Sequence, residues 1–140
     1  MGIIKSSLLI LLVLQLLLIC YTDIRYRVIS NIHNMAIAIN TLTLGFALHN
    51  TFSVIIPLIA LLVGYVIFNF KLIGGGDVKL IAALLFSLSP GQSLDFIIYT
   101  AIMGGIVMAI GMIINRSDIQ QRGVPYAVAI TGGFLLSLFY

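Results

Sequence analysis

Long runs of apolar residues separated by short polar stretches extend over the whole chain. Six runs are present, and the stretches between them are too short to form a second domain. The runs cover residues 6–21, 33–49, 51–70, 78–88, 94–115 and 124–140. Because about 20 apolar residues in a helix cross the hydrocarbon core of a bilayer, the pattern predicts an all-α, polytopic membrane protein of about six transmembrane helices, forming a single domain over residues 1–140.

The fourth run, residues 78–88, is too short to cross a bilayer alone. It follows Gly74, Gly75, Gly76 and Asp77. Either the helix begins within these glycines, or the glycines form a loop at membrane depth. Irregular backbone is tolerated there only inside protein or beside a water-filled cavity. We therefore expect the glycine segment to line a cavity.

Small residues recur every four positions in two of the runs. Ala60 and Gly64 do so in the third run, and Ala101, Gly105 and Ala109 in the fifth. Such spacing allows close approach of helix backbones in lipid. It predicts that both stripes pack inside the helix bundle.

The composition agrees with a membrane protein. Of the 140 residues, 61% are hydrophobic and 8% are charged, whereas soluble domains average about 25% charged residues. The net charge of +3 does not indicate a nucleic-acid partner, because the cations occur singly or in pairs between apolar runs. The single cysteine, Cys20, excludes an intramolecular disulfide and a cysteine-rich zinc site.

Basic residues are distributed unevenly over the polar stretches. The connections after the first, third and fifth runs share one face and hold Arg25, Arg27, Lys71, Lys79, Arg116 and Arg122, whereas the other face holds Lys5. Since cytoplasmic loops carry the excess of Lys and Arg, this predicts that the shared face is cytoplasmic and both termini are outside. The first run lacks a small-residue cleavage site after it, so we interpret it as a retained helix rather than a signal peptide.

Two aspartates stand at the predicted cytoplasmic ends of apolar runs. Asp23 ends the first run and Asp77 precedes the fourth. Two adjacent carboxylates share a proton because like charges repel in a low dielectric. The ionised member can activate water while the other donates to a carbonyl oxygen, as in aspartic proteases. Glycines beside Asp77 would admit a substrate backbone closely. An aspartate near a helix end, taken alone, is however more often an interfacial anchor or a helix N-cap than a catalytic group.

The local sequences around the two aspartates favour the catalytic interpretation. Asp23 opens DIRYRVISN, and Asp77 lies in GGGDVKL. These segments resemble the two signatures of the type IV prepilin peptidases, which are membrane aspartic proteases of the GxGD type. The C-terminal GVPYAVA is similar to the last helix of that family. The resemblance extends from the first aspartate to the end of the chain and implies that Asp23 and Asp77 are catalytic.

Two departures from the family pattern concern the turn and the domain content. Ser30 stands where the family usually has proline before Asn31. The chain also lacks the cysteine-rich domain of members that N-methylate the processed pilin, so methyltransferase activity is not expected. It resembles the short, peptidase-only members of tight-adherence (Flp) pilus systems.

The resemblance implies a substrate and a location. Prepilins and pseudopilins carry a short basic leader, a glycine at the cleavage site and then a hydrophobic helix. The leader stays in the cytoplasm, so we expect the site on the cytoplasmic face of a prokaryotic inner membrane, in contact with lipid. No metal or organic cofactor is expected.

Other polar residues receive structural interpretations. Asn31 is expected to support the loop after Asp23, and Lys79 to mark the membrane boundary or tune the charge of Asp77. Arg25 and Arg27 are interpreted as topology anchors. Asp118 is expected in a solvated loop, outside the catalytic pair, as is Asp95 on the opposite face.

Two further hypotheses come from other functional classes. A small proton-coupled transporter or channel could use the aspartates as relay groups, with Gln15, Asn40 and Asn69 as polar groups along a path. A structural membrane subunit without chemistry would make both motifs coincidental. The oligomeric state does not follow from the sequence.

Overall fold

A computed structural model describes residues 2–50 and 54–139, and this part of the chain folds into seven α-helices. They are α1 (Ile3–Tyr26), α2 (Asn31–His49), α3 (Ile55–Asn69), α4 (Gly75–Leu85), α5 (Pro90–Ile114), α6 (Arg116–Arg122) and α7 (Tyr126–Phe139). The predicted all-α fold is therefore confirmed.

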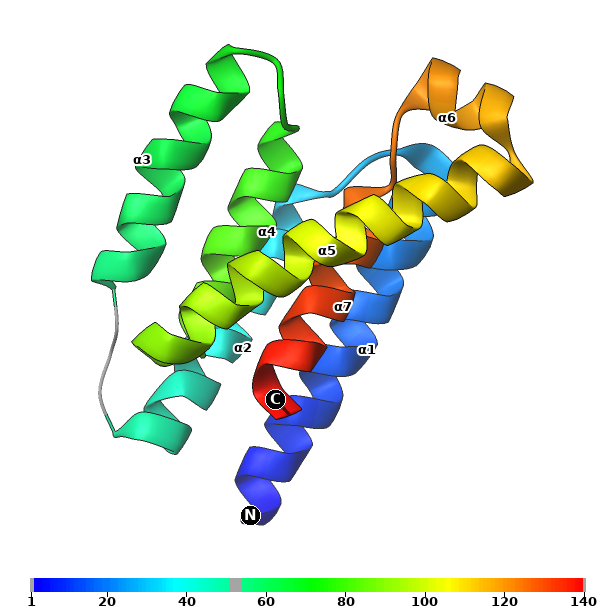
Figure 1. Ribbon diagram of the computed structural model, residues 1–140. Helices are drawn as coiled ribbons and strands as arrows, with labels where there is room; N and C mark the ends of the chain where they lie inside the picture. The colour runs from blue at the N-terminus through cyan, green and yellow to red at the C-terminus, as the bar shows by residue number, and fades with distance from the viewer. Residues whose placement is uncertain (1, 51–53, 140) are drawn as a thin grey trace.

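The helices form one bundle with an outlying helix and a crossing helix. Helix α1 packs between α2 and α7, and α4 packs between the same two helices, so these four form a ring. Helix α3 packs against α4, and α5 crosses α7 obliquely (Figure 1). The described chain ends lie at one end of the bundle. The α1–α2 and α3–α4 connections lie at the opposite end together with α6 (Figure 1). This common end is the one that the alternation of the apolar runs predicts, and its cytoplasmic orientation stays a prediction.

Two helices in the described part of the chain, α1 and α5, are long and apolar enough to cross a membrane. A third span results if α6 and α7, which bend by 97° at their junction, count as one. The apolar α3 has 15 residues and α4 has 11. The structure thus supports two to three spans by length and composition, and six spans stay a prediction.

Several helix boundaries differ from those expected. Helix α4 begins at Gly75, so the glycines start the helix, as the first of the two alternatives held. Helix α5 begins at Pro90 rather than near residue 94. The reason is that Ser89 and Gln92 form a capping box and proline suits the first helical position. Residues 51–53 and 140, which belong to the third and sixth apolar runs, lie outside the described residues.

The core joins α1, α2, α4, α5 and α7 through aliphatic side chains and one aromatic pair. The rings of Phe96 on α5 and Phe134 on α7 meet edge to face, with centroids 6.0 Å apart. Fully buried members include Leu12, Leu16, Ile19, Ile37, Leu44, Leu80, Leu84 and Ile130. Many other apolar side chains, such as Ile10, Leu62 and Ile110, are exposed on the outside of the helices. Such outward apolar faces suit a lipid environment.

The two stripes of small residues have different outcomes. Gly64 lies directly against Val78, so its packing between α3 and α4 is confirmed. The prediction for Ala101, Gly105 and Ala109 is wrong, because all three are exposed on α5. A tightly packed glycine of the α5–α7 contact is instead Gly133 on α7, which faces the Thr100 backbone.

Candidate active site

Asp23 lies in the last turn of α1 and is buried, with 7% of its surface exposed. Its Oδ2 accepts a hydrogen bond of 3.0 Å from the backbone N–H of Ala127. Ala127 is in the first turn of α7. A helix N-terminus carries free N–H groups and a partial positive charge, so this position stabilises a carboxylate.

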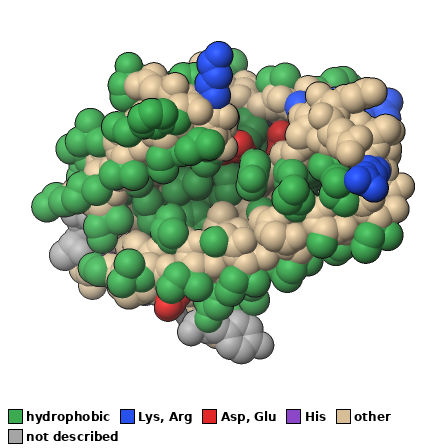
Figure 2. Space-filling view, turned by 45° about the horizontal axis from the view of Figure 1, so that its top comes forward, with side chains coloured by type: hydrophobic (Ala, Val, Ile, Leu, Met, Phe, Trp, Pro, Cys, Tyr) green, Lys and Arg blue, Asp and Glu red, His purple; other side chains and the backbone are tan. Residues whose placement is uncertain are grey.

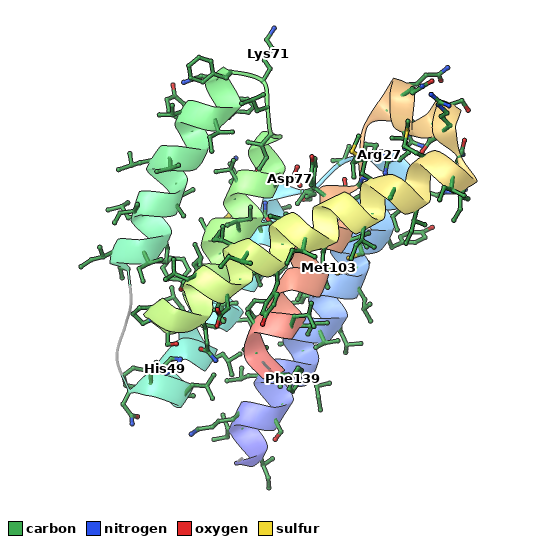
Figure 3. All side chains as sticks on the ribbon, in the orientation of Figure 1. Arg27, His49, Lys71, Asp77, Met103 and Phe139 are labelled. Atoms are coloured by element: carbon green, nitrogen blue, oxygen red, sulfur yellow. The ribbon has the colours of Figure 1, made fainter. Side chains whose placement is uncertain are left out.

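Asp77 lies in the first turn of α4, ahead of the apolar run 78–88. Asp23 and Asp77 line the same cavity, which has a volume of about 750 Å³. Figure 3 shows Asp77 and Arg27 at the end of the bundle that carries Lys71, far from His49 and Phe139. Two segments that are 54 positions apart in the chain (77 − 23) thus meet at one hollow.

The walls of this cavity combine acidic, basic and apolar side chains. Arg27, Lys71, Arg122 and Tyr126 line it together with the apolar residues Leu72, Ile73 and Val124. Figure 2 shows acidic side chains beside a hollow with apolar walls, with Lys and Arg side chains on the same face. The cavity therefore offers an extended backbone both apolar surface and fixed charge.

The three glycines before Asp77 occupy different environments. Gly74 lines the cavity, and a Cβ there would lie 3.2 Å from Oδ2 of Asp77. Gly75 packs on the ring of Phe68, and a Cβ on Gly76 would lie 3.0 Å from Cβ of Ile29. Gly76 therefore permits the close approach of α4 to the segment after Asp23. The role of the glycines in substrate approach stays a prediction, and Gly74 has the position that suits it.

Asn31 and Lys79 contact each other across the α2–α4 interface. The Lys79 Nζ donates a hydrogen bond of 2.9 Å to Oδ1 of Asn31. Both residues line a separate cavity of about 390 Å³ between α2, α3 and α4, rather than the cavity of the aspartates. This contact supports the start of α2, which follows the loop after Asp23.

Asn34 is a site-supporting residue that the sequence analysis missed. It is buried, and its Nδ2 donates a hydrogen bond of 3.3 Å to the carbonyl of Gly76, the residue before Asp77. The signal that could have identified it is a second asparagine, one helical turn after Asn31 and within an apolar run. Asn34 thus connects α2 to the beginning of α4.

Asp118 corrects the expectation of a solvated loop. It lies in the short helix α6, where the side chain of Asn115 accepts a hydrogen bond from its backbone N–H. Its carboxylate forms ion pairs with Arg27, at 2.9 Å, and with Arg122, at 3.2 Å. Arg122 also donates to the carbonyl of Arg25. These ion pairs and the hydrogen bond hold helix α6 against the end of α1, close to Asp23 in the chain.

Burial raises the pKa of Asp77 from its ordinary value of 3.8 to about 6. The negative charge of Asp23 raises this pKa further, and a hydrogen bond with the Gly74 backbone opposes the shift. A carboxyl group that keeps its proton up to about pH 6 is better suited than an ordinary aspartate to donate a hydrogen bond or a proton. The two acids of the cavity therefore have environments that allow different protonation states.

This raised pKa predicts a pH-dependent stability gain in Asp77→Asn. Between pH 4 and 6 the folded state binds more protons than the unfolded state, so stability falls as the pH rises through this window. Asparagine removes the cost of ionising the buried group, by about 2 kcal/mol at pH 7.5. We expect thermal unfolding in detergent to give a higher Tm for Asp77→Asn than for the unchanged protein at pH 7.5, a smaller difference near pH 4.5, and similar values near pH 3.5. A lower Tm at pH 7.5 would contradict the assignment of a raised pKa.

Within the described residues, no group of three or more His, Cys, Asp or Glu side chains is placed to share a metal ion. Chemistry that the cavity itself supports is that of two carboxyl groups, one in the last turn of α1 and one in the first turn of α4. Two carboxyl groups that line one cavity can act as an acid–base pair on a water molecule and a carbonyl group bound there.

Comparison with models of known protein families gives a match. The family model of the type IV leader peptidase family matches residues 10–110, which is most of the chain and includes both aspartates and the glycines before Asp77. No curated protein and no solved structure matches the chain.

Proposed function

Because the chain belongs to the type IV leader peptidase family, we propose that it is a membrane aspartic endopeptidase that removes the basic leader from prepilin or pseudopilin precursors. Membership in this family implies aspartic peptidase activity and prepilin substrates. The finer assignment, with Asp23 and Asp77 as the catalytic pair, rests on one observation. The two carboxyl groups, each at a helix end and each inside a family motif, line one cavity.

The proposed reaction is a direct hydrolysis. One ionised carboxylate takes a proton from a water molecule, and the water oxygen attacks the scissile carbonyl carbon as the protonated partner donates its proton to the carbonyl oxygen. The tetrahedral intermediate then breaks its C–N bond: the leaving nitrogen takes the proton that the base removed from water, and the other carboxylate takes a proton back from a hydroxyl group of the intermediate. The products are a leader with a new C-terminal carboxylate and a mature chain with a new amino terminus.

The cavity suits a substrate that enters from the end of the bundle. A peptide bond within a helix has its carbonyl hydrogen-bonded, so the scissile segment must be extended to be attacked. Gly74 leaves room beside the Asp77 carboxylate, because a side chain at this position would reach Oδ2 of Asp77. The lining cations Arg27, Lys71 and Arg122 reduce long-range attraction for a basic leader, so we expect binding energy to come mainly from the hydrophobic helix.

The polar groups inside the helices support the peptidase over the proton-relay hypothesis. Asn40 on α2 donates hydrogen bonds to Oε1 of Gln15 (3.0 Å) and to the carbonyl of Leu8 (3.3 Å). These two residues therefore contact each other across the α1–α2 interface. Asn69 lies at the cavity of the aspartates, not along a path to the other end of the bundle.

Co-expression with prepilin precursors tests the proposed activity. We expect a precursor with a basic leader, a glycine at the cleavage site and a hydrophobic helix to lose its leader, visible as a faster band and as a lower intact mass. A matched precursor with the glycine replaced by a bulky residue should stay uncut. Absence of processing for a panel of such precursors, with the peptidase present in the membrane, would contradict the proposal.

The membrane orientation gives a separate prediction. The connections near residues 30, 73 and 120 hold six of the seven basic residues, so we expect them in the cytoplasm and the connection near Asn50 outside. Reporter fusions after residues 30, 75 and 120 should report the cytoplasm, and a fusion after Asn50 should report the exterior. A cytoplasmic result at Asn50 would overturn the six-span orientation.

A further inference from the structure

We propose that Arg27, held by Asp118, is a positioning residue that assigns the two roles within the aspartate pair, so that Asp23 acts as the base and Asp77 as the acid. This inference rests on the proposed function and deepens it. It concerns the ion pair between Arg27 at the end of α1 and Asp118 of helix α6, and Asp118 lies outside the two family motifs.

Arg27 contacts the main-chain carbonyl of Asp23 through both its backbone N–H and its side chain. It is the C-cap of α1 in the left-handed region, with φ 54°, and its N–H donates to the carbonyl of Asp23 at 2.9 Å. Its Nη1 approaches the same carbonyl at 3.4 Å. Its Nη2 binds Oδ2 of Asp118 at 2.9 Å, and 15% of its side chain is exposed. The guanidinium is therefore held beside the last turn of α1, and it lines the cavity with both aspartates.

The charge of this guanidinium acts on the aspartate pair. Arginine stays protonated at every pH of interest, and a charge in a partly buried wall is screened less than one in bulk water. The Nε of Arg27 is buried and has no hydrogen-bond partner among the described residues. Asp118 offsets part of the positive charge of Arg27. The remainder favours a negative charge on Asp23, whose main-chain carbonyl the guanidinium contacts.

Asp23 and Asp77 differ in what stabilises their charged forms. Asp23 accepts the N–H of Ala127 at the beginning of α7 and lies four residues from Arg27. Asp77 is held at the start of α4, where burial and the charge of Asp23 disfavour its ionisation and raise its pKa to about 6. The first negative charge of the pair therefore belongs on Asp23, and the shared proton on Asp77.

Other charged or titratable groups around the pair must be considered in any pH experiment. They are Cys20 from α1, Lys71 from the α3–α4 connection, Asp118 and Arg122 from α6, and Tyr126 from α7. Each variant described below replaces a single residue and leaves the other groups in this list unchanged.

The test is the pH profile of leader cleavage by Arg27→Gln and Asp118→Asn, measured as kcat/KM in detergent on a prepilin peptide that the unchanged protein cleaves. Removing the cation should move the acid limb to higher pH by about half to one unit. Removing the anion of Asp118 leaves Arg27 less neutralised, so the acid limb should move to lower pH, by about a quarter to half a unit. A merely structural ion pair predicts the same response for both variants, because either change breaks it.

Two controls separate charge from folding. Arg27→Lys keeps the charge, so its acid limb should stay within about 0.3 unit of the unchanged protein. Arg25→Gln removes the same charge from an exposed position on the same helix turn and should shift the limb less than Arg27→Gln. If Arg27→Gln does not fold, the pH profiles of Asp118→Asn and Arg27→Lys still test whether the charge of Arg27 sets the acid limb.

Shifts in the same direction for Arg27→Gln and Asp118→Asn, or no shift in either, would overturn the assignment. Failure of the proposed function looks different. In that case Asp23→Asn retains full cleavage, or the unchanged protein cleaves no prepilin peptide and gives no pH profile.

Discussion

Replacing either Asp23 or Asp77 with asparagine is expected to reduce leader cleavage at least about a thousandfold, with the protein still present in the membrane at its normal level. Asparagine has nearly the same shape as aspartate, but it neither carries the negative charge nor transfers the proton. Both side chains line the proposed catalytic cavity, so each change removes half of the acid–base pair. Cleavage measured by mass spectrometry, together with the amount of membrane protein, checks this result.

The double variant and a matched control sharpen the experiment. Residues that act as a unit are strongly non-additive, so Asp23→Asn combined with Asp77→Asn should be no worse than either single change. Asp95 lies near the start of α5, far from the cavity, and Asp95→Asn should keep most of the activity. Substantial cleavage by Asp23→Asn or by Asp77→Asn would rule out the pair. The stability gain expected for Asp77→Asn at pH 7.5 means that its loss of activity would not come from unfolding.

Gly133→Ala is expected to destabilise the protein by about 3 kcal/mol or more, because overpacking here meets backbone rather than a movable side chain. A Cβ on Gly133 would lie 2.6 Å from the backbone nitrogen of Thr100 and would also meet its Oγ1. Helix α7 must then move away from α5. Since α7 carries the N–H of Ala127 that binds Asp23, we expect cleavage to fall together with stability. Thermal unfolding in detergent and the cleavage assay measure the two effects.

Gly105→Ala is the matched control on the facing helix. A Cβ at this position meets no atom of the described residues within 4 Å, and alanine is the better helix former by about 1 kcal/mol. We therefore expect unchanged or slightly higher stability and unchanged cleavage. Equal effects of the two substitutions would show that α5 and α7 are not in close contact at Gly133.

The sequence predicted the helical fold and the two aspartates because both depend on local patterns. Apolar runs of sufficient length specify helices in a membrane, and carboxylates at the ends of such runs are costly enough to draw attention. The alternation of runs also placed Asp23 and Asp77 at one end of the bundle. The glycines at 74–76 predicted a cavity wall, and Gly74 lies in one.

The parts that the sequence did not predict depend on contacts between distant segments. Arg27 and Asp118 are 91 positions apart (118 − 27), and each alone looks like an ordinary charged residue beside a membrane helix. The fifth-run stripe was misjudged for another reason. Outward residues of a membrane helix are apolar as well, so small residues every four positions do not distinguish the packed face from the lipid face. Ala101, Gly105 and Ala109 are exposed, and the close contact falls on Gly133.

The decisive measurement is the intact mass of the products when the purified protein acts on a prepilin precursor. We expect two products whose masses add up to the precursor plus one water molecule, with the break directly after the leader, and no products with Asp23→Asn or Asp77→Asn. An uncleaved precursor with the unchanged protein, or the same two products at the full rate from either variant, would contradict hydrolysis by an Asp23–Asp77 pair.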